Sequence, residues 1–213
     1  MVIPREPRRI TYSSEIRALK NKAFSSGQKS IIEGSLLGDG SLQASWSGKS
    51  YRFASMHSIK QKEYIDWMYE KLKPFVLSMP WFYAPKRSLR IRTISHLELT
   101  EMHGNFYRDK VKVLPANIAE IIRDPLALAV WFMDDGNLVA SGGYRHGYHL
   151  NTQGFSEDEN RVIQKLFKTI WNFDCSLQKN NGKHRIYIGS ASRDAFAKTV
   201  RSHLLPSMQY KLG

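Results

Sequence analysis

One short stretch of sequence constrains the fold more than any other, because it occurs twice. Residues 126–136 read Leu-Ala-Leu-Ala-Val-Trp-Phe-Met-Asp-Asp-Gly, an apolar segment that ends in two carboxylates and a glycine. A less regular copy spans residues 31–40, and the two align with Asp39 on Asp135. An apolar helix rarely ends in a carboxylate that has no use, because an unpaired buried charge is costly. The repeat therefore predicts two adjacent helices that present Asp39 and Asp135 to one metal-dependent site.

The elements that follow each copy are predicted to repeat in the same order. Hydrophobic periodicity predicts the following elements after the first copy: strands 41–46 and 51–56, helix 64–72, strands 81–83 and 89–94, and helix 97–107. It predicts the following elements after the second copy: strands 137–140 and 148–152, helix 156–171, strands 175–179 and 185–188, and helix 192–204. The sequence Asn180-Asn-Gly182 is a strong hairpin-turn signal between the last two strands.

The whole chain is therefore predicted to be an α+β fold of two pseudo-symmetric αββαββα repeats, with antiparallel sheets and the two repeated helices packed together. The spacing from Asp39 to His57 equals the spacing from Asp135 to Gln153, which supports the repeat. The predicted boundaries are a basic N-terminal arm over 1–27, a first repeat over 28–108, a linker over 109–124 and a second repeat over 125–213.

The charge of the chain predicts a polyanionic partner, usually nucleic acid, because Lys plus Arg is 32 against 19 Asp plus Glu. The predicted hairpins cover residues 41–57, 80–95, 136–156 and 175–193, and none of the 19 acidic residues falls in them. Long basic side chains on antiparallel strands can contact phosphates and base edges in the major groove. The predicted DNA-binding residues are Arg52, Lys86, Arg87, Arg90, Arg92, Arg145, Asn151, Lys179, Lys183, Arg185, Tyr187 and Arg193.

Several other classes of protein are excluded or disfavoured. The single Cys175 excludes a disulfide framework and a cysteine-rich zinc site. No apolar run approaches the roughly 20 residues that a membrane-spanning helix needs, so no membrane partner is expected. The seven histidines show no spacing typical of a ββα-metal nuclease, and no nucleotide-binding glycine loop is present.

The segments Ile32–Gly40 and Leu128–Gly136 occupy the frame of the nine-residue LAGLIDADG motif. With the repeat around them, the chain resembles a single-chain LAGLIDADG homing endonuclease, and segments 128–136, 150–153 and 210–212 are most similar to the branch that includes I-SceI. The resemblance implies a monomer with two saddle-shaped sheets over double-stranded DNA. It also implies staggered cleavage of both strands at a long, specific site.

The resemblance also implies roles for particular residues. Asp39 and Asp135 would hold the catalytic divalent ion, Mg²⁺ or Mn²⁺, which is consistent with the preference of hard cations for oxygen ligands. Gly38 and Asp134 are secondary metal candidates, and Asp134 is expected to contribute its backbone carbonyl, because Gly38 stands at the equivalent place.

Two lysines and a glutamine complete the predicted site. Lys211 matches the second-half lysine of the related branch, and Lys112 is its first-half counterpart, with Lys110 as the alternative. Gln153 matches a polar residue that lines the site, and its first-half equivalent is either His57 or Met56.

The rival interpretation is an RNA-binding maturase that assists splicing of its own group I intron. A maturase keeps the fold but need not keep the acids, so the presence of both aspartates favours the nuclease.

Overall fold

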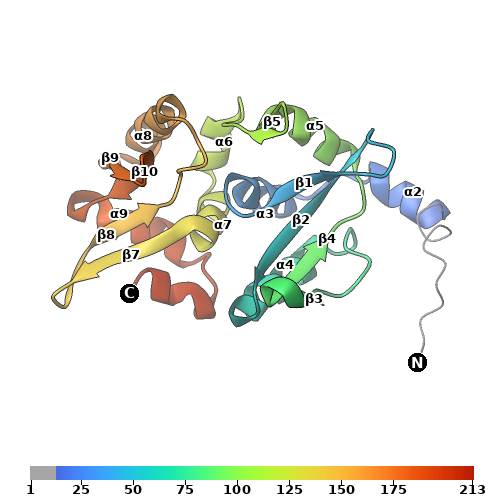
Figure 1. Cartoon of the computed structure of the whole chain (residues 1–213), viewed down its shortest axis with the longest axis horizontal. Coiled ribbons are helices and arrows are strands. Elements are labelled where there is room, and N and C mark those ends of the chain that lie inside the picture. The colour runs from blue at the N-terminus through green and yellow to red at the C-terminus, as the bar shows by residue number, and fades with distance from the viewer. Residues whose placement is uncertain (1–12) are drawn as a thin grey trace.

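Two four-stranded antiparallel sheets, one in each half of the chain, flank a central pair of helices (Figure 1). The computed structural model describes residues 13–213. The strand orders are β1-β2-β4-β3 and β7-β8-β10-β9, so strands at equivalent places in the sequence take equivalent places in the sheets. This topology confirms the predicted α+β fold with two repeats.

The first half begins with a helix in the segment expected to be a basic arm. Its elements are α2 Ser14–Asn21, α3 Ser26–Leu37, β1 Ser41–Ala44, β2 Tyr51–Ser58, α4 Lys62–Leu72, β3 Trp81–Tyr83, β4 Ser88–Arg92 and α5 Leu97–Phe106, with short 3₁₀ turns at Ile59–Gln61 and Ala84–Lys86. Helix α3 starts at a capping box in which Ser25 and Gln28 satisfy each other's backbone N–H groups. Residues 1–12 of the expected arm lie outside the described residues.

The segment expected to be a linker, 109–124, contains regular structure of its own. Strand β6, Val111–Lys112, pairs with β5, Tyr107–Arg108, at the end of α5. Helix α6 spans Ile118–Arg123 and buries Ile118, Ile121 and Ile122. The segment is therefore packed into the molecule between the two halves.

The second half follows the predicted order with shifted boundaries. Its elements are α7 Pro125–Asp135, β7 Gly136–Ser141, β8 Tyr144–Leu150, α8 Glu157–Trp171, β9 Cys175–Asn180, β10 Lys183–Ile188, α9 Ser190–Arg201 and a 3₁₀ helix, η3, over Pro206–Lys211. Strand β8 begins before the predicted residue 148 because Gly142 and Gly143, with φ of 57° and 79°, close a two-residue turn. Asn181 and Gly182 form the predicted turn in the same way, with φ of 51° and 76°.

Helices α3 and α7 pack against each other in the middle of the molecule, between the sheets (Figure 1). They approach so closely that a Cβ on Gly34 would lie 2.3 Å from the carbonyl oxygen of Ala127. All residues from Ala127 to Met133 are buried, which explains the apolar sequence of α7. The ends of the two helices, where the aspartates lie, are thereby held together.

Each sheet has one face covered by helices and one that carries polar side chains. Leu89, Ile91, Ile186 and Ile188 are buried on the helix side. Helices α4 and α5 pack on the first sheet, and α8 and α9 pack on the second. Among residues 13–213, every helix is too short or too polar to cross a membrane.

Candidate active site

The side chain of Asp134 lies at the junction of the two halves. Its carboxylate is fully buried. Oδ2 accepts hydrogen bonds from Ser35 Oγ at 3.0 Å and from the backbone N–H of Asp39 at 3.1 Å. Oδ1 accepts a hydrogen bond from the hydroxyl of Tyr64 at 2.8 Å. All three donors belong to the first half, so the side chain of Asp134 joins the two halves, a role that is separate from its predicted place as a secondary metal candidate.

Gly38 provides the space for this side chain. A Cβ on Gly38 would lie 2.5 Å from Cβ of Asp134 and 2.9 Å from its Oδ2. The two residues occupy equivalent positions in the two motifs. The two halves therefore differ at this position because the Asp134 side chain occupies the space that a side chain on residue 38 would need.

Three carboxylates gather at the helix ends. The Asp39 side chain is 51% exposed, whereas Asp135 is half-buried. Burial, followed by the charge of Asp39, raises the pKa of Asp134 to about 7. Burial, followed by the charges of Asp134 and Asp39, raises the pKa of Asp135 to about 7. This crowding of negative charge among oxygen donors fits a divalent cation, which would relieve the repulsion.

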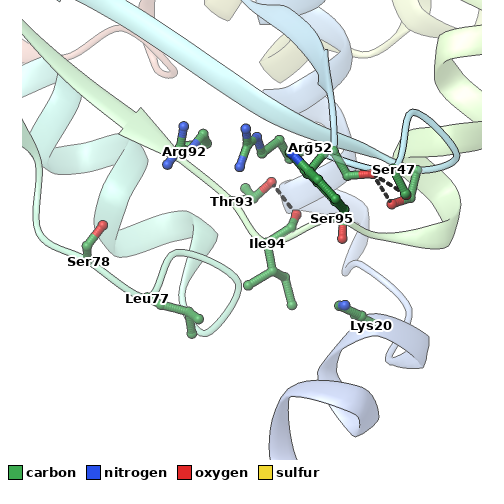
Figure 2. A pocket seen from close by; sticks show the side chains of 12 residues that line it. Lys20, Ser47, Arg52, Leu77, Ser78, Arg92, Thr93, Ile94 and Ser95 are labelled. Atoms are coloured by element: carbon green, nitrogen blue, oxygen red, sulfur yellow. Dashed lines mark hydrogen bonds between the residues drawn. The ribbon is translucent and has the colours of Figure 1, made fainter. Parts of the chain in front are cut away.

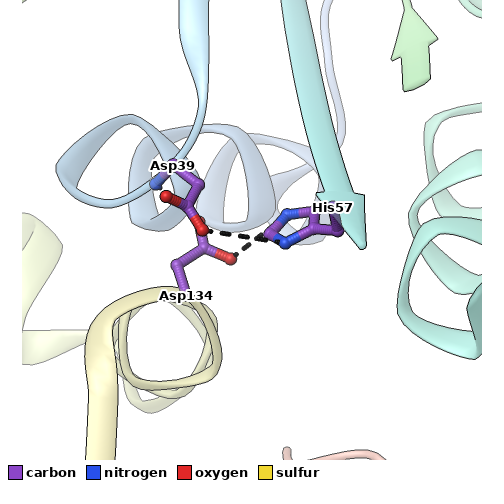
Figure 3. A group of neighbouring side chains, drawn as sticks. All are labelled: Asp39, His57 and Asp134. Carbon is purple, nitrogen blue, oxygen red and sulfur yellow. Dashed lines mark hydrogen bonds and ion pairs between the residues drawn. The ribbon is translucent and has the colours of Figure 1, made fainter. Parts of the chain in front are cut away.

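His57 lies against two of these carboxylates (Figure 3). Its Nδ1 is 3.7 Å from Asp39 Oδ2, and its Nε2 is 3.6 Å from Asp134 Oδ1. Burial lowers the pKa of the imidazole, although the charge of Asp39 opposes this shift. The sequence offered only its spacing from Asp39 as a signal for this residue.

A lysine lies at the C-terminal end of each motif helix. Lys112 Nζ donates to the carbonyl oxygens of Gly38 at 2.7 Å and Gly40 at 2.9 Å. Lys211 Nζ donates to the carbonyl oxygens of Met133 at 2.5 Å and Asp134 at 3.3 Å. Free carbonyls and the helix dipole favour a cation at these ends. The lysines therefore contact the same carbonyl oxygens through which Gly38 and Asp134 would reach a metal ion, and that ligation stays a prediction.

The C-terminal tail carries Lys211 into the site. Met208 and Leu212 are buried on either side of it, and Lys211 itself is only 7% exposed. Burial lowers the pKa of Lys211 and of Lys112, while the nearby aspartates oppose both shifts. The alternative, Lys110, is exposed in the turn between β5 and β6 with a φ of 67°.

Gln153 is half-buried beyond β8, where its Nε2 donates to Asn180 Oδ1 at 3.4 Å. The strand register gives this residue a different counterpart from the one predicted by spacing. Ile91 and Ile186 occupy equivalent places in β4 and β10. Ser55 pairs with Ile91, and Leu150 pairs with Ile186, so Ser55 and Leu150 are equivalent as well. His57, two residues after Ser55, therefore corresponds to Thr152, and Met56 corresponds to Asn151.

The polar face of the first sheet is basic and aromatic. Arg90 pairs with Trp81, and its guanidinium lies 4.9 Å from the ring centroid of Tyr83. Arg92 lies 5.5 Å from the centroid of Trp81. Burial, followed by the charges of Arg52 and Arg90, lowers the pKa of Arg92. Three guanidinium groups are therefore held close together on one surface.

This face continues into a cavity of about 420 Å³ at the outer end of the sheet. Figure 2 shows Arg52 and Arg92 projecting toward the same space, with Lys20 of α2 below them. The lining residues are Lys20, Ser45, Trp46, Ser47, Ser50, Arg52, Leu77, Ser78, Arg92, Thr93, Ile94 and Ser95. The lining contains three bases and no acid, which suits an anionic ligand.

The second sheet presents Lys183, Arg185 and Tyr187 along alternate positions of β10. Arg185 Nη1 donates to Asn151 Oδ1 at 3.3 Å, and Asn151 Nδ2 donates to the carbonyl of Asp135 at 2.7 Å. Asn151 therefore connects the basic face to the carboxylate site. Within the described chain, Nε of Arg52 and Nε of Arg185 are buried without hydrogen-bond partners.

The remaining predicted DNA-binding residues do not all lie on these faces. Lys179 pairs with His184, which places it on the helix-covered face, near Glu157 of α8. Arg193 lies on α9, where it donates to the carboxylate of Asp194 and to the carbonyl of Arg145. These two residues lie away from the polar sheet faces, because a count of bases in a hairpin does not distinguish its faces, and their contacts with DNA stay predictions. Lys86, Arg87 and Arg145 are exposed.

A family model, curated proteins and a solved structure are all similar to this chain over most of its length. The model of the LAGLIDADG DNA endonuclease family matches residues 29–196. DNA endonuclease I-ChuI of Chlamydomonas applanata is 29% identical over 206 residues, covering 87% of this chain and 94% of that protein. Cytochrome b mRNA maturase bI2 of Debaryomyces hansenii is 28% identical over 207 residues, covering 91% and 76%. The structure of homing endonuclease I-WcaI bound to its DNA recognition sequence has a TM-score of 0.85 at 24% identity, covering 95% and 93%.

Proposed function

The chain belongs to the LAGLIDADG DNA endonuclease family, and from that premise we propose that it is a site-specific homing endonuclease. It acts as a monomer and makes staggered breaks in both strands of double-stranded DNA at a long site. The observation that carries this proposal is the packing of α3 against α7, which places the helix ends that carry Asp39 and Asp135 close enough for the charge of Asp39 to raise the pKa of Asp135, after burial and the charge of Asp134. Residues 28–108 and 125–213 are proposed as the two repeats. The chain is proposed to belong to the branch of the family that includes I-SceI.

Asp39 and Asp135 would hold Mg²⁺, or Mn²⁺ in its place. The bound ion would supply Lewis acidity at the phosphodiester and neutralise the charge that develops there. Support comes from the oxygen donor set and from the raised pKa of Asp135, about 7, which is caused first by burial and then by the charges of Asp134 and Asp39. Lys112 and Lys211 hold the helix-end carbonyls and bring positive charge beside the reacting phosphate. Gln153 lines the second half of the site.

The DNA would lie across the polar faces of both sheets. Arg52 and Arg185 each keep a buried Nε that no residue among 13–213 satisfies, and a phosphate or a base edge would satisfy it. Arg90 and Arg92 add charge close to Arg52. Affinity would therefore come mainly from the sheets and cleavage from the carboxylates, so the two can be separated by mutation.

The second candidate is a maturase for a group I intron RNA, because one relative carries that name. A maturase could use the same basic faces and would not need the carboxylates. Substitution of the acids therefore distinguishes the two functions.

The test starts from cleaved sites selected out of a random duplex library in the presence of Mg²⁺. Asp39→Asn and Asp135→Asn should each abolish double-strand cleavage of the selected site and leave binding nearly unchanged. Asp66→Asn is the matched control, because the side chain of Asp66 on α4 is 44% exposed and pairs with Lys62. Full cleavage by either active-site variant would overturn the assignment.

A further inference from the structure

The cluster of Asp39, His57 and Asp134 has a donor set that the proposed cleavage reaction does not require. We propose that these three residues form a binding site for one transition-metal ion of the Zn²⁺ class. This site is separate from Mg²⁺ ligation by Asp39 and Asp135, and the two sites share only Asp39.

The distances within the cluster fit ligands of a single ion. One donor atom from each residue lies within 4.8 Å of the other two. Only one ring nitrogen can bind a given ion, and Nε2 is 3.6 Å from Asp134 Oδ1, which is too long for a hydrogen bond. Ligands at about 2.0–2.2 Å from a tetrahedral zinc ion are roughly 3.4 Å apart. The Nε2–Oδ1 separation is close to this spacing, and the Asp39 side chain, which is half exposed, can rotate to complete the ligand set.

His57 gives an independent indication of a ligand. Its side chain is 1% exposed, and its Nε2 has no hydrogen-bond partner among residues 13–213. Figure 3 shows the ring on the far side of the gap from the two carboxylates, with its nitrogens toward them. A buried polar atom in a native structure is nearly always satisfied by protein, water or an ion. A metal ion between the ring and the carboxylates would satisfy this nitrogen.

The donor set favours zinc-class ions over Mg²⁺. Imidazole is a good ligand for Zn²⁺ and other late transition metals, whereas Mg²⁺ prefers oxygen ligands and keeps its waters. One imidazole and two carboxylates leave an open position, as in zinc sites with three protein ligands. Ser35 and Tyr64 fix the orientation of Asp134 through hydrogen bonds, as outer residues do around metal ligands.

The second half cannot build an equivalent site. Gly38 stands at the position of Asp134, and the strand register places Thr152 at the position of His57. The chain is therefore expected to bind one zinc-class ion. Binding would occupy Asp39 and so compete with Mg²⁺, a consequence that rests on the proposed nuclease function, whereas binding itself does not.

The test uses the full chain without DNA. Isothermal titration calorimetry with ZnCl₂ should show a stoichiometry of one bound ion per chain. His57→Gln and Asp39→Asn should each weaken binding at least roughly tenfold, as expected for losing a metal contact. His146→Gln is the matched control, because His146 is exposed on β8. Titration with Co²⁺ should give a visible absorption band that changes in the His57→Gln protein.

Circular dichroism of each variant establishes that it is folded. If His57→Gln unfolds, the test compares Asp39→Asn, at a side chain that is half exposed, with Asp135→Asn. Only Asp39→Asn should weaken zinc binding, whereas zinc bound at the Asp39 and Asp135 site would be weakened by both. The proposal is overturned if the wild type binds no zinc, or if the folded His57→Gln and Asp39→Asn variants bind zinc with wild-type affinity and stoichiometry. The readout requires no cleavage, so its failure is distinguishable from failure of the proposed nuclease function.

Discussion

Replacing Gly34 by alanine tests whether the close contact between α3 and α7 organises the molecule. The added Cβ would lie 2.3 Å from the carbonyl oxygen and 3.0 Å from Cα of Ala127, whereas ordinary contact begins at 3.4 Å. The clashing atoms belong to the backbone of α7 and cannot rotate away. The two helices must therefore separate locally by about 1 Å, within an interior that is packed at crystal-like density.

The expected loss of stability combines two opposing effects. Overpacking of a core costs about 1–3 kcal/mol, and a rigid backbone contact belongs at the upper end of that range. Alanine recovers about 0.5–1 kcal/mol in a helix interior relative to glycine. The Gly34→Ala protein should therefore lose about 2 kcal/mol, which lowers Tm by roughly 4–8 °C in a chain of this size.

Gly104→Ala is the matched control, because Gly104 lies in α5 and a Cβ there would meet nothing within 4 Å. The free energy of unfolding of that protein should rise by about 0.5–1 kcal/mol. The same substitution should therefore stabilise the protein at residue 104 and destabilise it at residue 34. Urea denaturation followed by tryptophan fluorescence measures both. Cleavage by folded Gly34→Ala should also fall, because Asp39 and Asp135 move apart. Equal stability of the two variants would refute the close-contact argument.

Three further predictions concern other residues. Lys211→Ala should slow single-turnover cleavage by roughly 10²-fold or more and change the affinity for the DNA site little, since it removes one charge at the reacting phosphate. A normal cleavage rate would show that Lys211 has no role in the reaction. Arg90→Ala and Arg185→Ala should each weaken DNA binding, by about 1–3 kcal/mol where the residue reads a base, and wild-type fluorescence anisotropy should fall steeply with salt. Wild-type affinity in both would place the DNA elsewhere. Tyr64→Phe should cost about 1–3 kcal/mol in urea unfolding, because Asp134 loses a buried donor, and an unchanged midpoint would contradict that role.

The sequence was informative where local signals repeat. Aligned Asp-Gly ends at Asp39 and Asp135 revealed two equivalent halves, and Asn181-Gly182 marked a turn that the structure contains. Apolar and polar residues alternate in the sequences of β4 and β10, and the apolar ones face the helices, because side chains in a strand point to opposite sides. The order of the elements and the apolar faces of the sheets follow from these signals.

The role of Asp134 could not be predicted in this way, because its partners are distant in sequence. Tyr64 and Ser35 lie 70 and 99 residues from it along the chain. Helix α6 was missed for a related reason. It has six residues and no side-chain cap, so it owes its stability to the burial of its isoleucines.

The fit of Asp134 into the space above Gly38 makes the two halves complementary parts that cannot substitute for each other. Joining two copies of the second half would oppose two buried aspartates, each occupying the space that the other needs. Joining two copies of the first half would leave two glycines facing an unfilled space, with Ser35 and Tyr64 lacking their acceptor. Recombination that exchanges halves between relatives should therefore yield a folded chain only when the glycine and the aspartate are inherited as a matched pair.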